Sequence, residues 1–359
     1  GLVTGVQTCA LPILSSQKKF LMIRFCENQP LKLYNTFGVE ATSQYFFEFT
    51  EVEDIDVFVQ SNESWIELPL FVLGGGSNVL FLDDFRGLVL HPNIPGIAIV
   101  KEDRQNVWVE VGAGEVWDDF VKYCVGYQLG GVENLSLIPG SAGAAPVQNI
   151  GAYGQEVSEV IELVKGYDLQ KKAHVEFTVE ACEFNYRDSL FKRELKNRVI
   201  ITSVIFKLEK FPQFNLAYGQ LAEKVAPLGE VTLQNVRQVV IDIRSSKLPD
   251  VNVLGNAGSF FKNPVVDVGL AEEIQERYHE VPVFPVNSQK VKLAAGWLIE
   301  KTGWKGRREG NVGVHEKQSL VLVNYGGATG NEIYNFSEKV SQVVFDKFGV
   351  KLEREVNCI

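Results

Sequence analysis

The sequence predicts a fold that mixes helices and strands, on two observations. Short apolar runs that alternate with polar residues or end in glycine are typical of strands, and they fall at 69–73, 107–111, 161–168, 175–179, 199–208 and 318–323. Apolar residues recur at helical spacing in 115–127, 232–246, 270–278, 289–301 and 331–348. Thr232 stands where an N-cap is expected. Residues 210–218 interrupt the pattern and predict a surface excursion.

Composition limits the class of protein. A chain of 359 residues with 45% hydrophobic and 22% charged content is typical of globular proteins and long enough for two or three domains. The net charge of -10 argues against nucleic acid or an anionic membrane as the main partner. Five scattered cysteines without CxxC spacing indicate reduced thiols in a cytoplasm. The four histidines are dispersed, so we expect no metal site.

The first 21 residues differ in character from the rest of the chain. Their apolar part is short and contains Pro12, and two lysines come after it, so a signal peptide and a membrane span are both poor interpretations. Met22 is the single methionine. We therefore expect Met22 to be the natural initiator and residues 1–21 to be a non-native leader.

The stretch 134–154 is the densest in small residues. Glycine and alanine let a backbone approach a flat or phosphorylated ligand closely, because no side chain keeps it away. Pro139 and Pro146 fix φ, which indicates a shaped loop and not a flexible linker. The alternative is a tight, buried crossover between strands. A second glycine cluster, Gly74-Gly-Gly-Ser-Asn78, can offer consecutive N–H groups to a pyrophosphate.

With Gly258-Ser-Phe-Phe-Lys-Asn-Pro264 added, these motifs resemble the UDP-N-acetylenolpyruvoylglucosamine reductase (UDP-N-acetylmuramate dehydrogenase) family. The resemblance runs from Asn35-Thr-Phe37 to Glu355. It implies an α+β FAD-binding fold of the vanillyl-alcohol-oxidase (PCMH) type in two subdomains, with a C-terminal α+β substrate-binding domain. The implied divisions are 29–92 together with 348–359, then 93–246, then 247–347.

The resemblance also implies FAD as cofactor and NADPH as electron donor. The first loop contains no histidine of the kind that attaches FAD covalently in other oxidases of this fold, so we expect noncovalent FAD. The expected FAD-binding residues are Gly74, Gly75, Gly76, Ser77, Asn78, Pro139, Gly140, Ser141, Gly143, Gln148, Asn149, Gly151, Ala152, Tyr153 and Gly154.

Three residues are the expected catalytic set. Arg187, in Tyr186-Arg-Asp-Ser189, carries a planar fork that matches a carboxylate, although a surface pair with Asp188 is the simpler interpretation. By resemblance it holds the enolpyruvyl carboxylate. Ser259 is assigned as the proton donor, which is reasonable because an enolate is a strong base. Glu355 is the glutamate that ends the family motif, and the tail Asn357-Cys-Ile359 departs from the family pattern.

The remaining assignments concern the substrate. Lys247 and Asn263 are expected on the UDP phosphates, and Tyr218 matches the substrate tyrosine of type I members; Gln318 matches a further contact. The implied reaction is NADPH-dependent, FAD-mediated reduction of UDP-N-acetylglucosamine-enolpyruvate to UDP-N-acetylmuramate, for peptidoglycan, by a cytoplasmic monomer. The alternatives are an FAD-dependent sugar or alcohol oxidase of the same fold, and a non-catalytic FAD- or UDP-sugar-binding module.

Overall fold

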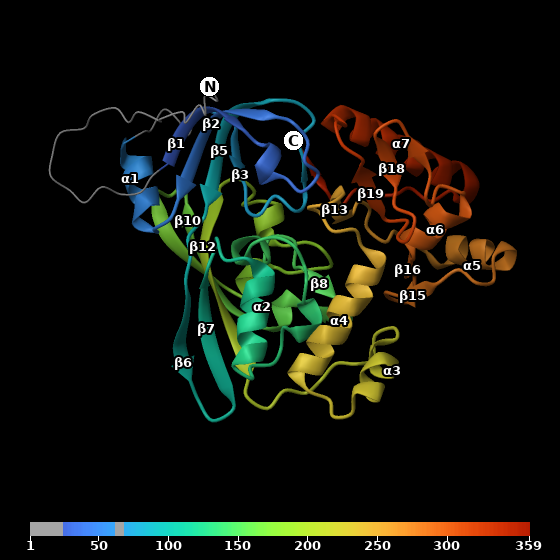
Figure 1. The fold of residues 1–359 in the computed structure, drawn as a ribbon, viewed down its shortest axis with the longest axis horizontal. Coiled ribbons are helices and arrows are strands. Elements are labelled where there is room, and N and C mark those ends of the chain that lie inside the picture. Colours follow the sequence, from blue (N-terminus) through green and yellow to red (C-terminus); the bar gives the residue numbers. More distant parts are fainter. Residues whose placement is uncertain (1–23, 62–67) are drawn as a thin grey trace, which may run out of the picture. The chain divides into compact units, whose positions relative to one another are not determined.

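The computed structural model describes residues 24–61 and 68–359, so the expected leader at 1–21 lies outside the described residues. The chain forms two compact units (Figure 1). Unit 1 comprises Ser43–Gly74 and Phe85–Gly219 with the described residues before Pro30, and unit 2 comprises Pro30–Thr42, Gly75–Asp84 and Gln220–Ile359. The chain thus enters unit 2 three times. The division expected from the sequence remains a prediction.

The first sheet of unit 1 contains parallel neighbours. Its strands, in spatial order, are β1 (Arg24–Pro30), β2 (Thr42–Phe49), β5 (Phe85–Pro92) and β3 (Leu70–Val72). Strand β5 runs parallel to both β2 and β3. Helix α1 (Glu53–Ser61) packs against this sheet through Phe58, whose ring lies 4.2 Å from that of Phe47. Stacked and tilted aromatic rings therefore form the core of this layer.

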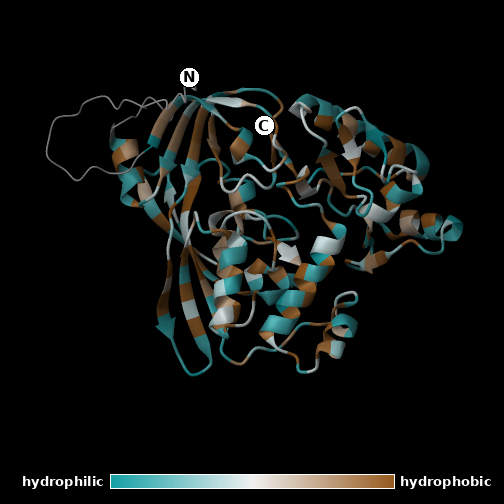
Figure 2. Cartoon of the chain, in the orientation of Figure 1, coloured by the Kyte–Doolittle hydropathy of each residue, from teal (hydrophilic) through white to brown (hydrophobic). Residues whose placement is uncertain are grey.

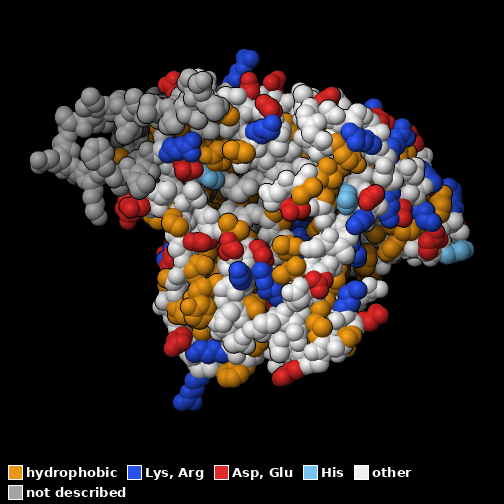
Figure 3. Space-filling model, in the orientation of Figure 1, with side chains coloured by type: hydrophobic (Ala, Val, Ile, Leu, Met, Phe, Trp, Pro, Cys, Tyr) orange, Lys and Arg blue, Asp and Glu red, His pale blue; other side chains and the backbone are white. Residues whose placement is uncertain are grey.

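The second sheet of unit 1 is antiparallel throughout. Its strands, in spatial order, are β11 (Ala173–Thr178), β10 (Ile161–Asp168), β12 (Val199–Glu209), β7 (Asn106–Gly112) and β6 (Ile97–Glu102). Helix α2 (Trp117–Gly126) lies beside it (Figure 1), and Trp117 packs on Phe206 of β12. The outermost strand, β6, is exposed, and apolar side chains gather over β6 and β7 in Figure 3.

Unit 2 combines two small sheets with helices. One sheet has the order β13 (Gly255–Ser259), β19 (Val321–Asn324), β18 (Val312–Val314) and β17 (Arg308–Glu309), and the other has β14 (Val265–Asp267), β16 (Lys290–Leu293) and β15 (Val283–Pro285). The helices are α3 (Leu221–Val225), α4 (Leu233–Lys247), α5 (Val268–Arg277), α6 (Ala295–Lys301) and α7 (Gly330–Phe348). Figure 2 shows hydrophobic and hydrophilic segments alternating along α4, as an amphipathic helix requires.

Pairs of very short strands complete these elements. Strands β8 (Gly151–Ala152) and β9 (Gln155–Glu156) form a hairpin in unit 1. In unit 2, β20 (Asn357–Cys358) lies parallel to β4 (Val79–Leu80). The C-terminal tail that departs from the family pattern is therefore part of the fold.

The expected elements are confirmed with one exception. The helix expected over 289–301 is wrong in its first part, because Lys290–Leu293 forms strand β16 and the helix begins only at Ala295. Val291 and Leu293 are buried while the two lysines between and before them are partly exposed, which is the two-residue period of a strand. Thr232 is confirmed as an N-cap, since its side chain accepts the N–H of Asn235.

The described residues contain no candidate membrane-spanning helix and no candidate metal cluster, but they do contain free cysteines. Within 24–61 and 68–359, no helix has the length and apolar character needed to cross a membrane. The same segments contain no group of three or more His, Cys, Asp or Glu side chains suited to a metal ion. Four free cysteines lie in the described chain, and burial raises the pKa of the Cys182 thiol to about 12.

Candidate active site

The predicted site residues are divided between the two units. Unit 1 carries Gly74, the loop 139–154, Arg187 and Tyr218. Unit 2 carries the remaining predicted residues, which are Gly75, Gly76, Ser77, Asn78, Lys247, Ser259, Asn263, Gln318 and Glu355. Each unit therefore carries its own set of predicted site residues.

In unit 1, the small residues of the loop 134–154 serve close packing of the protein on itself. A methyl group on Gly143 would lie 2.5 Å from the Cβ of Ala113, and the Gly143 N–H donates to the Ala113 carbonyl. A methyl group on Gly74 would lie 2.9 Å from the Ser141 hydroxyl oxygen. The alternative of a tight crossover therefore accounts for part of the glycine content, alongside any ligand.

The same loop also has a feature that points to a bound group. The Ser141 side chain is 9% exposed, and its hydroxyl finds no hydrogen-bond partner among the described residues. A buried hydroxyl without a partner is unfavourable by roughly 1–3 kcal/mol, so such atoms usually meet a water or a ligand. Ser141 therefore fits a polar atom of a cofactor such as FAD.

The glycine cluster in unit 2 forms a second cradle. Gly76 has φ +65°, and a methyl group there would lie 1.9 Å from the carbonyl oxygen of Tyr34. The Gly76 carbonyl accepts the N–H of Thr36, whose own buried hydroxyl has no partner among the described residues. Only glycine fits this turn, and Thr36 adds a donor that the sequence pattern did not single out.

Arg187 is held tightly within unit 1. Its backbone is left-handed, with φ +53°, and its side chain is 19% exposed. One terminal nitrogen, Nη2, donates to the Gly151 carbonyl at 2.6 Å, and Nη1 lies 3.5 Å from the Asn149 carbonyl. Asp188 forms an ion pair with Arg193. The guanidinium is thus turned toward the 149–151 segment of the glycine-rich loop.

Tyr218 lies close to the same loop. Its side chain is half-exposed, and its ring meets that of Tyr153 edge-on at 6.1 Å. Two asparagines fix this arrangement: Asn134 donates to the carbonyls of Tyr153 and Asn215, and Asn215 donates to the carbonyl of Gly154. Unit 1 therefore brings the loop 139–154, Arg187 and Tyr218 together. Sequence reasoning missed Asn134 and Asn215, because their contacts join segments far apart in the chain.

In unit 2, the backbone brings Ser259 and Glu355 into neighbouring positions. Ser259 ends β13, opposite Val321 of β19. The next residue, Phe260, accepts the N–H of Glu355 at 2.8 Å, and Phe261 bridges to Arg354. Both Ser259 and Glu355 are half-buried. The two predicted proton-handling residues therefore lie on adjacent extended segments.

The C-terminal tail fixes Glu355 from the other side. The Asn78 side chain donates to the Glu355 carbonyl at 3.2 Å, and the Asn78 carbonyl accepts the N–H of Asn357. Ile359 then donates to the Leu80 carbonyl. The residues 357–359 depart from the family pattern, yet they tie Glu355 to the glycine cluster that ends at Asn78.

The three other predicted substrate residues of unit 2 lie apart in the sequence. Lys247 is exposed at the end of α4. The Asn263 side-chain oxygen accepts the N–H of Ala295 at the start of α6. The Gln318 side-chain oxygen faces the N–H of Leu320 at 3.4 Å, beside Gly296.

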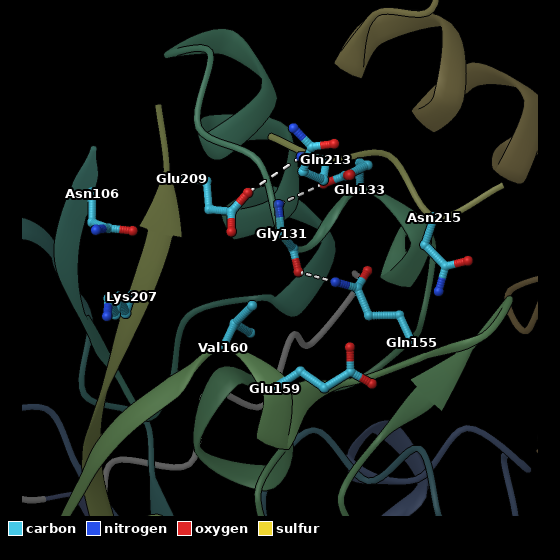
Figure 4. Close-up of a pocket in the computed structure, with 10 residues that line it drawn as sticks. All are labelled: Asn106, Gly131, Glu133, Gln155, Glu159, Val160, Lys207, Glu209, Gln213 and Asn215. Atoms are coloured by element: carbon cyan, nitrogen blue, oxygen red, sulfur yellow. Dashed lines mark hydrogen bonds between the residues drawn. The ribbon is translucent and has the colours of Figure 1, made fainter. Parts of the chain in front are cut away.

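A separate polar pocket of about 330 Å³ lies in unit 1 (Figure 4). None of the predicted site residues lines it. Glu133 and Gln155 both bond to the backbone of Gly131 there, and Glu209 accepts the N–H of Gln213. Burial raises the pKa of the Glu133 carboxyl above its usual range.

Comparison with known proteins agrees with this architecture. Residues 44–171 match the FAD binding domain family, and residues 249–359 match the UDP-N-acetylenolpyruvoylglucosamine reductase, C-terminal domain. The crystal structure of UDP-N-acetylenolpyruvylglucosamine reductase from Thermus caldophilus superimposes with a TM-score of 0.64 at 23% identity, over 94% of this chain and 99% of that one. The fold and the matched domains define a flavin-dependent oxidoreductase with an FAD-binding fold.

Curated relatives are more similar in sequence. The UDP-N-acetylenolpyruvoylglucosamine reductase of Flavobacterium johnsoniae is 46% identical over 335 residues, which is 92% of this chain and 98% of the relative. The UDP-N-acetylenolpyruvoylglucosamine reductase of Dechloromonas aromatica is 49% identical over 290 residues, which is 79% of this chain and 86% of the relative. The chain belongs to the UDP-N-acetylenolpyruvoylglucosamine reductase family. The resemblance and the FAD-binding fold deduced from the sequence are confirmed.

Proposed function

We propose that the chain reduces the enolpyruvyl double bond of UDP-N-acetylglucosamine-enolpyruvate to give UDP-N-acetylmuramate, with electrons from NADPH. The observation that carries the proposal is the backbone bond between Phe260 and Glu355, which sets Ser259 and Glu355 on adjacent segments of a chain of this family. Bound FAD supplies the hydride transfer between NADPH and the substrate. The protein's own residues must then bind the substrate, orient it and protonate the enolate.

The proposed role of Arg187 is to bind the substrate carboxylate and to stabilise the enolate that forms when hydride reaches the double bond. A guanidinium stays charged at every relevant pH and offers a planar fork to carboxylate oxygens. Its two terminal nitrogens already face the carbonyls of Gly151 and Asn149, so the fork has a fixed direction. A fixed donor stabilises developing negative charge without reorganising in the transition state.

The proposed proton donor is Ser259. A hydroxyl is a weak acid, but an enolate carbon is basic enough to accept its proton. The position at the end of β13, anchored opposite Val321, limits how far the hydroxyl can move. Glu355 is proposed to act beside it, by holding or replacing the proton of the serine.

The remaining roles concern the nucleotide end of the substrate. Lys247 and Asn263 are proposed to meet the UDP phosphates; because the Asn263 oxygen accepts the Ala295 N–H, the phosphate contact falls to its amide nitrogen. Tyr218 and Gln318 are proposed as further substrate contacts. For FAD, the proposed residues are the glycine cluster and the loop 139–154, with Ser141 as a hydroxyl that needs a partner.

The test is the visible spectrum of the purified protein under anaerobic conditions. NADPH should bleach the flavin absorbance, and the enolpyruvyl nucleotide should restore it. Oxygen consumption with a sugar or alcohol as sole substrate, without recovery by the enolpyruvyl nucleotide, would instead identify an oxidase of the same fold. A protein that binds flavin but performs neither step would be a binding module.

The expectation of a cytoplasmic monomer stays a prediction. Size-exclusion chromatography with light scattering gives the mass directly, and a mass twice that of one chain would contradict it.

A further inference from the structure

We propose that Glu156 is a positioning residue for Arg187 and acts through Asn149. This inference rests on the proposed function, since Arg187 is taken to bind the substrate carboxylate. Neither the sequence pattern nor the family motif singled out Glu156. Glu156 belongs to β9 of the hairpin β8–β9, and its carboxylate faces the Arg187 guanidinium.

The contacts of Glu156 define two arms. One carboxylate oxygen, Oε2, accepts the side-chain amide of Asn149 at 2.8 Å. The other, Oε1, lies 3.8 Å from Nη1 of Arg187. The Glu156 carboxylate therefore bonds to the Asn149 side chain and faces the Arg187 guanidinium, which in turn faces the Asn149 carbonyl.

Asn149 connects the same parts of unit 1 from inside. It is 1% exposed and has φ +45°, a backbone conformation that asparagine tolerates better than most residues. Its amide also donates to the carbonyl of Asn185, two residues before Arg187, and its oxygen accepts the N–H of Ser158. These bonds use both amide hydrogens of Asn149, so any contact of its side chain with FAD falls to the second lone pair of Oδ1.

Glu156 is itself held in place. It is the N-cap of the short helical turn Val157–Glu159, in a reciprocal capping box in which its N–H donates to the Glu159 carboxylate at 3.0 Å. Its main chain also belongs to β9. A carboxylate fixed in this way can fix a neighbour.

The pair with Arg187 is too long to be a stabilising contact of note. At 3.8 Å, with side chains 34% and 19% exposed, an ion pair contributes little to folding. Its geometric effect is larger: Nη1 faces Glu156 and the Asn149 carbonyl, and Nη2 faces Gly151. Because the guanidinium is planar, contacts at its two terminal nitrogens set the direction of the whole fork.

The test compares Glu156→Gln and Glu156→Ala with the wild-type holoenzyme. Gln keeps the shape and can still accept the Asn149 amide but loses the charge, whereas Ala removes both arms. We expect flavin content and the rate of flavin reduction by NADPH to stay near wild type in both variants. The melting temperature should stay near wild type in Glu156→Gln and fall in Glu156→Ala, because Ala leaves one N–H of the buried Asn149 amide without an acceptor. Reoxidation by the enolpyruvyl nucleotide should slow by about 10-fold for Gln and about 100-fold for Ala, as expected for a misdirected binding group.

Glu159→Gln is the matched control. It neutralises a carboxylate three residues away, in the same capping box, and weakens the acceptor of the Glu156 N–H. All four quantities should stay at the wild-type level. A loss like that of Glu156→Gln would show that any disturbance of this turn slows the enzyme, which would overturn the proposal.

A double-mutant cycle separates positioning from general structure. If Glu156 acts only through Arg187, Arg187→Lys combined with Glu156→Gln should be no slower than Arg187→Lys alone. A double variant slower than Arg187→Lys alone would overturn the proposal, as would loss of flavin or a lower melting temperature in Glu156→Gln. If the wild type is not reoxidised by the enolpyruvyl nucleotide, the proposed function fails first; if it is, and both Glu156 variants match it, only this inference fails.

Discussion

The predicted site residues of the two units are held by different means. In unit 1, Arg187 lies on a left-handed turn, and its direction depends on side-chain contacts with the carbonyls of Gly151 and Asn149. In unit 2, Ser259 and Glu355 lie on extended segments whose backbones are bonded to their neighbours. Backbone ladders do not depend on the identity of nearby side chains, whereas side-chain networks do.

This difference predicts two kinds of mutational response. Substitutions among the predicted site residues of unit 2 should change chemistry or affinity at the altered residue and leave the backbone frame intact. Substitutions among those of unit 1 should act over a wider range, because one displaced group moves others. Variants in both units, compared for turnover, flavin content and stability, can test that contrast.

Ser259→Ala should have the greatest effect on turnover. The change removes one hydroxyl, and the strand pairing of residue 259 with Val321 is unaffected, so folding and flavin content should survive. Flavin reduction by NADPH needs no proton on a substrate carbon and should run near the wild-type rate. Stopped-flow reoxidation by the enolpyruvyl nucleotide should slow by about 10²–10⁴-fold, the usual contribution of a positioned general acid.

Ser259→Cys is the companion variant and should retain part of the activity, since a thiol can also donate a proton. If Ser259→Ala is reoxidised at the wild-type rate, the serine is only a turn residue. Glu355 would then be the next candidate for the acid.

Gly143→Ala should disturb the predicted site residues of unit 1 as a group. A methyl group there would lie 2.5 Å from the Ala113 Cβ and 2.8 Å from its Cα, so backbone must shift. We expect most of the bound FAD to be lost on purification, together with a lower melting temperature, both measured on the same sample. Gly126→Ala is the control, because a methyl group at Gly126 would meet nothing within 4 Å. Full flavin content in Gly143→Ala would show that this loop is more compliant than its packing indicates.

The sequence predicted most of the fold for identifiable reasons. Strand β10 and helix α7 have clear apolar periods, and the glycine-rich motifs are long enough to specify a family. The expected helix at 289 failed because four residues of strand period, Lys290–Leu293, precede α6 without a polar break.

The sequence could not predict how the site residues are held. Asn134 contacts Asn215, 81 positions away, and no local pattern encodes such a pairing. The left-handed backbone of Arg187 is equally invisible, because arginine rarely adopts it. Only one local pattern points to Glu156. It lies three residues before Glu159, ahead of an apolar run, and this spacing is a weak form of the capping-box pattern.

Lys247→Ala should produce a smaller and purely local effect in unit 2. Lys247 is exposed at the end of α4, so its removal should not disturb packing. We expect the KM for the enolpyruvyl nucleotide to rise by about 10-fold, consistent with loss of one charged hydrogen bond, while flavin reduction by NADPH stays unchanged. Lys224→Ala, at an exposed lysine of unit 2, should leave both unchanged. Equal damage to both half-reactions would place Lys247 outside the nucleotide site.

Stability should change least, and here the interior of unit 1 should again be more sensitive than the surface of unit 2. In unit 1, Arg198 donates to both carboxylate oxygens of Asp168, which is 1% exposed, and these bonds hold the pKa of Asp168 below its usual range. In unit 2, Lys339 and Arg307 lower the pKa of Glu309, but that carboxylate is 31% exposed. Exposed pairs contribute little to stability.

Asp168→Asn should therefore lower the melting temperature at pH 7, whereas Glu309→Gln should leave it nearly unchanged. The sign of the pH dependence follows from linkage: a depressed folded pKa contributes stability that is present above the unfolded pKa, about 3.9 for an aspartate, and is lost as the pH falls through the lower folded pKa. The difference between wild type and Asp168→Asn should thus be constant from about pH 7 to about pH 5 and shrink below about pH 4. Scanning calorimetry across this range measures it. A difference that persists unchanged at the lowest pH would mean that Asp168 stabilises unit 1 through neutral hydrogen bonds to the N–H groups of Gln170 and Lys171, and not through its charge.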